Sequence, residues 1–452
     1  MSTRVLVPSG VLGLGFDETT LEAGVATEPH IIAIDGGSTD SGPFYLGTGT
    51  SKYSRAACKS EWKQLLQARQ LAKVPLVITS CGTCGTDSMV DWMLEITTEI
   101  ARELSMSLTV ATLYSEQSPA FIKSQWDKGN ITPLAPIIHL DTESIEHIDR
   151  IVALAGAEQI NEALATGADV VLAGRATDTA GICALPIARG EHNGAAWHGA
   201  KVAECGALCS THPTSGVIAL EVDDSGFTVW PLAQNARCTP HSVSAHMLYE
   251  NADPLTLYEP GGALKVSDAK YTSVNDRTVR VTGSRWETSE GYTVKLEGAR
   301  SVGYQSTLMA ILRDAHYVKN AKAWVSRLSE FLSNEIERRM SLASSDYDVE
   351  FRLIGVDATL GELEKKTSQA TEVGVLVLIT ASDEKTADEL GKLINPFLLH
   401  YPLTDNEDLP TFAFPYSPAQ TNRGAMYEFC LNHILKLQNP MDAFRLTVHQ
   451  IN

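Results

Sequence analysis

Apolar runs of strand length alternate with helix-like stretches from residue 5 to about residue 200. Five runs rich in valine, isoleucine and leucine predict buried strands, over residues 5–7, 31–34, 76–78, 108–113 and 170–172. Apolar residues recur at helical spacing between them, over residues 54–69, 89–104 and 145–164. This alternation predicts an α/β fold with a doubly wound, mostly parallel sheet.

Shorter strands and turns replace this alternation after residue 205. Two hairpins are predicted, from residues 217–222 with 227–230 and from 271–274 with 278–282, and a strand follows over 292–304. The last part combines helical and strand patterns, with helices over 324–336 and 384–400 and strands over 347–353 and 373–380. We therefore expect an α/β domain over residues 1–205, a β-rich region over 206–310 and an α+β C-terminal domain over 311–452.

Three of the predicted strands end in loops of small residues that each carry an aspartate. The first loop reads Asp35-Gly36-Gly37-Ser38-Thr39-Asp40, and the other two read TSCGTCGTDS after residue 78 and AGRATDTAG after residue 172. Parallel strands would bring the three loops to one edge of the sheet, where α/β proteins bind ligands. We expect a cleft lined by these loop residues: Asp35, Gly36, Gly37, Ser38, Asp40, Gly82, Gly85, Asp87, Arg175 and Asp178. The alternative for Asp87 and Asp178 is a role as helix N-caps.

Two further groups of polar residues lie later in the sequence. Lys201, Glu204 and Cys205 fall at the junction of the first two predicted domains. Lys295 and Glu297 are two residues apart in the predicted strand over 292–304, so both side chains lie on one face and could present a base and an acid together. The alternative for this pair is an exposed ion pair.

The charge of the chain narrows the choice of partners. A formal net charge of −19 and a pI near 5.1 argue against binding to nucleic acids or to anionic membranes, which requires a basic patch. The longest apolar run, residues 373–379, has the length of a strand, and the N-terminal residues lack the core of a signal peptide. The eight cysteines lie mostly in apolar or helical contexts, which suits reduced thiols, so we expect a cytoplasmic location.

Motifs for familiar cofactors are incomplete. Cys81-x2-Cys84, and Cys205-x3-Cys209 followed by His212, resemble zinc half-sites, but the glycines around the first pair equally suit a tight loop. The glycines over residues 9–15 do not follow the G-x-G-x-x-G order, and no H-E-x-x-H or G-x-S-x-G motif occurs. We assign no metal ligands and leave the cofactor open, although Asp35 and Asp40 could hold a Mg²⁺-like divalent cation.

Several long strings of the sequence resemble one family. The acyclic terpene utilisation (AtuA) family is similar to this chain in PSGVLGLGFDE, IAIDGGSTDSGPFYLGTG, GADVVLAGRATDTA, ECGALCSTHP, CTPHSVSAHMLYENADPLTLYEPGG and YTVKLEGARSVGYQS. The resemblance covers essentially the whole chain and implies a cytoplasmic protein of a catabolic or biosynthetic gene cluster. The resemblance also implies which polar motif positions matter for function. They are Asp35, Gly36, Gly37, Ser38, Asp40, Gly174, Arg175, Asp178, Glu204, Cys205, Lys295, Glu297 and Arg300. Relatives have small residues in place of Cys81 and Cys84, which disfavours a metal or redox role for that pair.

These residues favour an enzyme. We expect a lyase or hydratase that acts on a small carboxylate or an acyl-CoA-type thioester, in a cleft between the α/β and β-rich domains. In this hypothesis Arg175 binds a carboxylate, Asp178 orients it, and Lys295 or Glu297 moves the proton. We expect Arg300 to contribute to substrate binding.

Two alternatives remain open from the sequence. An acyl hydrolase or transferase would use Cys205 as the nucleophile beside Glu204. A non-catalytic subunit would instead bind a ligand or a neighbouring enzyme through its glycine-rich loops. In each case we expect a homo-oligomer whose ligand is a small carboxylate or an acyl thioester.

Overall fold

The computed structural model describes residues 2–366 and 370–452. The chain divides into two compact units: unit 1 comprises the residues up to Arg300 together with Phe429–Asn452, and unit 2 comprises Ser301–Glu428. The predicted α/β domain and nearly all of the predicted β-rich region therefore lie in unit 1, which also receives the end of the chain.

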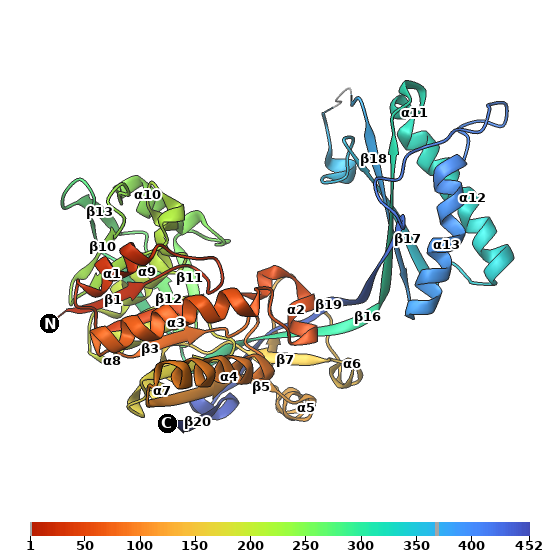
Figure 1. Ribbon diagram of the computed structural model, residues 1–452. Coiled ribbons are helices and arrows are strands. Elements are labelled where there is room, and N and C mark those ends of the chain that lie inside the picture. Colours follow the sequence, from red (N-terminus) through yellow and green to blue (C-terminus); the bar gives the residue numbers. More distant parts are fainter. Residues whose placement is uncertain (1, 367–369) are drawn as a thin grey trace. The chain divides into compact units, whose positions relative to one another are not determined.

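Unit 1 is built on a ten-stranded sheet with the order β13-β14-β10-β9-β1-β2-β3-β8-β4-β20 (Figure 1). Its five central strands are parallel: β1 (Thr3–Val7), β2 (Ile31–Asp35), β3 (Leu76–Thr79), β8 (Val170–Ala173) and β4 (Leu108–Tyr114). The flanking strands are antiparallel: β9 (Ile218–Val222), β10 (Gly226–Pro231), β13 (Lys270–Ser273), β14 (Val279–Thr282) and β20 (Arg445–Ile451). The α/β class is confirmed, and the sheet is mixed where a mostly parallel one was predicted.

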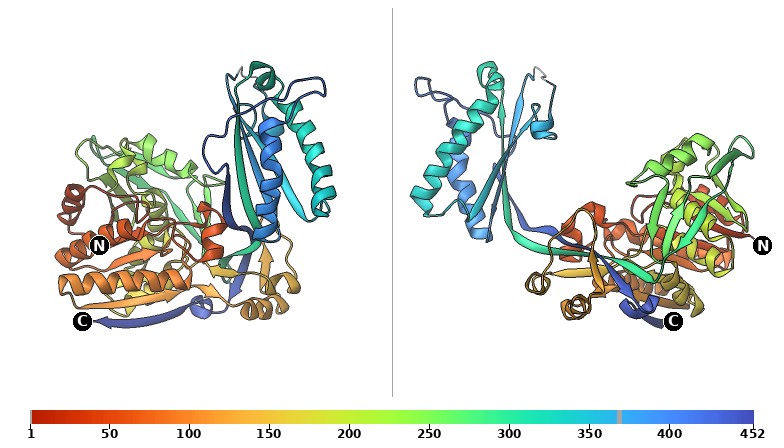
Figure 2. Two further views of the ribbon diagram at one scale, coloured as in Figure 1. Left: turned by 45° about the vertical axis from the view of Figure 1, so that its right-hand side comes forward. Right: turned by 180° about the vertical axis from the view of Figure 1, so that it is seen from behind.

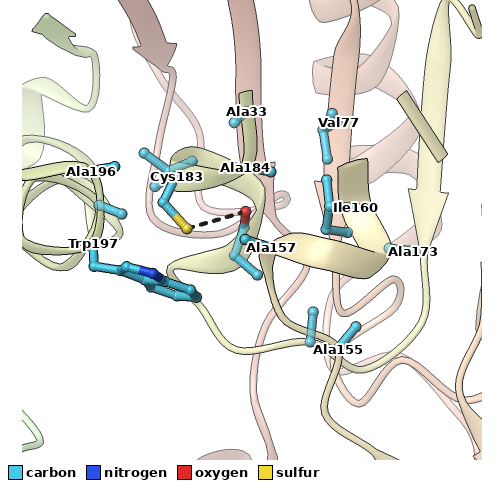
Figure 3. Packing of buried hydrophobic residues seen from close by; sticks show 14 of the residues in the cluster. Ala33, Val77, Ala155, Ala157, Ile160, Ala173, Cys183, Ala184, Ala196 and Trp197 are labelled. Atoms are coloured by element: carbon cyan, nitrogen blue, oxygen red, sulfur yellow. Dashed lines mark hydrogen bonds between the residues drawn. The ribbon is translucent and has the colours of Figure 1, made fainter. Parts of the chain in front are cut away.

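The central strands of the sheet are buried on both faces because their apolar residues alternate between two cores. Leu6 and Ile32 contribute to a core with α1 (Glu18–Val25), α3 (Arg55–Ala72) and α4 (Asp87–Leu104). Val5 and Ala33, one residue away, contribute to the opposite core. That core is closed by α7 (Ala157–Ala165), α8 (Ala180–Ala188) and α9 (Asn193–Ala203). Figure 3 shows Ala33 and Val77 of the sheet near Cys183 and Ala184 of α8.

One predicted helix is wrong. Residues 145–164 form the end of α6 (Thr142–Glu146), then β7 (Arg150–Ala153) and then α7. Ile145, Ile148 and Ile151 recur at helical spacing and all are buried, but β7 pairs with β16, where Val152 lies opposite Glu297. This pairing is made with residues far along the chain, so it leaves no local signal.

Smaller elements complete unit 1. They include α2 (Pro43–Thr48), β5 (Glu116–Gln117), α5 (Pro119–Asp127), β6 (Ile131–Pro133), α10 (Pro240–Ala245), β11 (Thr256–Glu259), β12 (Gly262–Lys265) and β15 (Arg285–Thr288). The 3₁₀ helices among the described residues are η1 (Thr39–Ser41), η2 (Gly206–Cys209), η3 (Pro213–Ser215), η4 (His246–Leu248) and η6 (Pro440–Ala443) in unit 1 and η5 (Gly361–Leu363) in unit 2. Both predicted hairpins form, as β9 with β10 and β13 with β14.

Unit 2 packs helices against an antiparallel sheet (Figure 2). Its elements are the later part of β16 (Tyr292–Leu312), α11 (Ala315–Lys319), α12 (Ala321–Met340), β17 (Tyr347–Ile354), β18 (Val373–Ala381), α13 (Glu384–His400) and the first part of β19 (Gln420–Leu437). Alternate residues of β18 are buried, and Val375 and Val377 share a core with Trp324 of α12. The helices and strands predicted here from period 3.6 and period 2 are confirmed.

Candidate functional site

A cavity of about 560 Å³ lies at the carboxyl ends of β1, β2 and β8 within unit 1. Its walls come from the loop over residues 9–15, the loop over 35–41, Asp178 and the segments after α9. We call it the strand-end cavity. The loops that follow β2, β3 and β8 do meet at one edge of the sheet, because the three strands are adjacent and parallel.

The loop after β2 is held against its neighbour by its glycines. The Gly36 amide donates a hydrogen bond of 2.7 Å to the carbonyl of Thr79. A Cβ atom on Gly36 would lie 2.5 Å from the Ser80 carbonyl oxygen, so only glycine fits there. Gly37 has a φ of 130°, which other residues rarely adopt. This geometry turns Asp35 and Ser38 into the cavity lining.

Asp35 combines burial with a place on the cavity wall. Asp35 is 7% exposed, and its carboxyl group accepts a hydrogen bond of 2.8 Å from Thr79 Oγ1. Burial raises the pKa of Asp35 well above its ordinary value, and the nearby Asp178 raises it further against the opposing effect of Arg175. Asp35 is therefore suited to carry a proton that it can donate into the cavity.

Arg175 belongs to a buried network and is not part of the cavity lining. Its guanidinium donates to Glu297 at 3.1 Å, to Asp178 at 3.2 Å and to Ser80 Oγ at 3.1 Å. Lys295 contributes a second cation, because its Nζ donates to the other oxygen of Glu297 at 2.8 Å. These contacts connect β8 with β16 and position Asp178, which does line the cavity.

The Glu297 carboxylate gives a pH-dependent test of this network. Burial opposes its charge, but Arg175 and Lys295 outweigh burial and lower the pKa of Glu297 to about 2. A carboxyl group with a lowered folded-state pKa stabilises the fold above its unfolded pKa, and this contribution is lost as the pH falls toward 2.

Glu297→Gln is therefore expected to unfold at a lower denaturant concentration than the parent at pH 7. The difference should narrow as the pH falls from 4.5 toward about 2, because protonation then neutralises the parent carboxylate as well. Denaturant titrations at a series of pH values measure this difference. A gap that stays constant down to pH 2 would contradict the charged network.

A second polar cluster lies where α9 ends. Lys201 Nζ donates a hydrogen bond to Glu204 Oε1, and both side chains are almost fully buried. Burial raises the pKa of Glu204 well above its ordinary value despite this lysine. Glu204 and Cys205 line the cavity, and the ligand atoms of Glu204, Cys205 and His246 lie within 4.8 Å of one another.

The charge of the lining is strongly acidic. Its ionisable carboxyl side chains are Asp35, Asp40, Asp178, Glu204 and Glu250, and Lys52 is its basic side chain. A bound molecule with a free carboxylate would therefore meet repulsion unless protons or a cation neutralise part of this set. The raised pKa values of Asp35 and Glu204 supply some of that neutralisation.

About half of the residues predicted from the sequence line the cavity: Asp35, Gly37, Ser38, Asp40, Asp178, Glu204 and Cys205. The others lie outside it: Gly36, Gly82, Gly85, Asp87, Arg175, Lys295, Glu297 and Arg300. Gly85 allows the loops to approach closely, since its Cβ would lie 2.1 Å from the Arg175 amide nitrogen. Asp87 is the first residue of α4 and pairs with Arg445 of β20.

Asp87 and Asp178 are not the N-cap residues of the helices that follow them. The N-cap of α4 is Thr86, and that of α8 is Thr179. Asp35 and Asp40, proposed above for Mg²⁺, belong to no cluster of three or more close metal-ligating side chains among the described residues.

Sequence reasoning missed several residues of this site. His246, Tyr249 and Glu250 lie more than 40 residues after Cys205, beyond α10. They lie in the string HSVSAHMLYENADP, which belongs to the family resemblance and matches no catalytic or metal-binding motif. Lys52 and Tyr53 also line the cavity, and no motif marks them.

Comparison with known proteins identifies the family. The family model described as acyclic terpene utilisation family protein AtuA matches residues 48–411, so the chain belongs to this family. Neither the comparison with curated proteins nor the comparison with solved structures gave a match. Across the described residues, the helices lack the combination of length and apolar character that a membrane crossing requires.

Proposed function

We propose that this AtuA-family chain is an acid–base lyase or hydratase that adds water to, or removes it from, a small acyl compound in the strand-end cavity. The observation that carries the proposal is the pair Asp35 and Asp178, which both line the cavity and interact electrostatically. Asp35 is buried with a raised pKa, whereas Asp178 is partly exposed and accepts a hydrogen bond from Arg175. Two neighbouring carboxyl groups in unlike environments suit the roles of acid and base.

The two carboxyl groups account for both proton transfers of a dehydration. The Asp178 carboxylate takes a proton from the carbon beside the acyl carbonyl, and the electrons of that C–H bond form the new C=C bond. The C–O bond to the hydroxyl group breaks, and Asp35 donates its proton to the departing oxygen, so water leaves. Hydration is the same sequence in reverse: Asp35 takes a proton from the attacking water as the C–O bond forms, and Asp178 returns its proton to the carbon beside the carbonyl.

The acidity of the lining favours an acyl thioester over a free carboxylate. A thioester carries no charge at the reacting end, whereas a carboxylate would face five acidic side chains and one lysine. The family description refers to acyclic terpene utilisation, which points to branched, unsaturated acyl chains as the class to test. Arg175 acts in this proposal as a positioning residue, because it holds Asp178 and does not line the cavity.

The test is a turnover screen with the full-length protein. CoA thioesters of branched 3-hydroxy and 2,3-unsaturated acids, together with short free hydroxy, unsaturated and amino acids, are incubated with the protein and followed by mass spectrometry. A gain or loss of water on a thioester supports the proposal. Saturable binding without any product across the panel would instead support a non-catalytic binding subunit.

A cysteine nucleophile is the second candidate, because Cys205 lines the cavity and His246 lies close to it. Burial and the neighbouring Glu204 raise the pKa of the Cys205 thiol, which opposes formation of the thiolate that attacks. Hydrolysis of a thioester with an acyl group trapped on Cys205 would establish this candidate, whereas turnover that survives in Cys205→Ser would exclude it.

A further inference from the structure

We propose that Glu204, Cys205 and His246 bind a zinc ion on the wall of the strand-end cavity. Each of these residues offers one ligand atom, and the three atoms lie within 4.8 Å of one another. Ligand atoms of a tetrahedral zinc site are about 3.5 Å apart, so the side chains need to move by only about 1 Å to close on an ion. A thiolate, an imidazole and a carboxylate are all ordinary zinc ligands.

His246 provides an independent observation. Its residue is 5% exposed, and its Nε2 atom is buried without any hydrogen-bond partner. A buried polar atom without a partner is costly to fold, so such an atom usually has a partner when the site is complete.

The surroundings of the three residues fit a bound cation. Lys201 donates to Glu204 Oε1 and leaves the second carboxylate oxygen for an ion, so it would orient this ligand from behind. Glu204 and Cys205 line the cavity, so a fourth coordination position would face the cavity, as in zinc sites that act on substrates. A dication would also offset the acidic lining formed with Asp178 and Glu250.

The three ligand types, a thiolate, an imidazole and a carboxylate, favour zinc over magnesium. A cysteine sulfur and an imidazole favour zinc and similar transition metals over magnesium, which prefers oxygen ligands. The site differs from the zinc-like spacing of Cys205, Cys209 and His212 noted in the sequence, because Cys209 and His212 do not belong to this cluster. The inference does not rest on the proposed acid–base function, since zinc binding is measured without a substrate.

The experiment titrates chelator-treated full-length protein with zinc chloride in competition with a chromophoric zinc indicator. We expect one zinc ion per chain, undisturbed by excess Mg²⁺, and affinity at least about 100-fold weaker in Cys205→Ser and in His246→Gln. The matched controls are Cys209→Ala and His212→Ala, which remove a buried thiol and an exposed imidazole nearby and should bind zinc like the parent.

A second readout covers variants that fold poorly. Cobalt(II) in place of zinc should give the charge-transfer absorption of a cobalt–thiolate bond in the parent and in Cys209→Ala, and not in Cys205→Ser. Circular dichroism of the metal-free proteins checks that each variant is folded. Failure of the parent to bind one zinc ion, binding that is unchanged in Cys205→Ser, or binding that is lost in Cys209→Ala would each overturn the proposal.

Discussion

Asp35→Asn is expected to lower turnover by about 10²- to 10⁴-fold while the melting temperature stays close to that of the parent. The asparagine amide has nearly the same shape as a protonated carboxyl group, and its oxygen can still accept the hydrogen bond from Thr79. Stability is therefore largely kept, because burial already favours the uncharged form of Asp35. What the amide cannot do is release a proton to a departing hydroxyl group.

The measurement uses whichever thioester shows turnover in the screen, with the melting temperature recorded for each variant. Asp40→Asn is the matched control, since Asp40 lines the same cavity but is exposed and has no assigned proton transfer. Asp40→Asn should therefore change turnover only slightly. Normal turnover in Asp35→Asn would remove Asp35 from the mechanism, and a sharply lower melting temperature with normal ligand affinity would make it a structural residue.

The parts of the fold that the sequence predicts are those with a local signal. The parallel strands β1, β2 and β3 are short apolar runs bounded by turn residues, and α4 repeats its apolar residues every three to four positions. The strand β20 shows why other parts could not be predicted. It is mostly exposed and polar, and it forms because Leu446 and Val448 lie opposite residues of β4 more than 300 positions earlier.

In the candidate site, too, the residues with a local sequence signal could be predicted and those brought in by tertiary packing could not. The loop residues Asp35 and Asp178 were found because glycines and hydroxyl side chains after an apolar strand indicate a ligand-binding edge. Lys295 and Glu297 lie on one strand face as predicted, since Lys295 Nζ donates a hydrogen bond of 2.8 Å to Glu297. Their spacing in the sequence could not show that both lie outside the cavity lining. His246 reaches Cys205 only through tertiary packing, so no motif joins the two.

Arg175→Met is expected to lower the free energy of unfolding by about 3–5 kcal/mol, because it removes the buried cation beside Glu297 and leaves this buried carboxylate only the half-exposed Lys295. Methionine fills much of the space of the arginine stem, so the loss reports mainly on charge and hydrogen bonding. Denaturant titration at pH 7 measures it. The matched control is Arg445→Met, whose partner Asp87 lies near the surface, where an ion pair contributes less than about 1 kcal/mol.

A double variant separates this network from the role that the sequence suggested for Arg175. If the loss comes from a buried Glu297 charge that Lys295 alone does not compensate, adding Glu297→Gln to Arg175→Met should recover a large part of the stability, because the second change removes that charge. A carboxylate-binding arginine would behave differently: Arg175→Lys would then weaken ligand binding with little change in stability. The burial of Arg175, which is 5% exposed and does not line the cavity, favours the first outcome, because a ligand in the cavity would not contact the guanidinium.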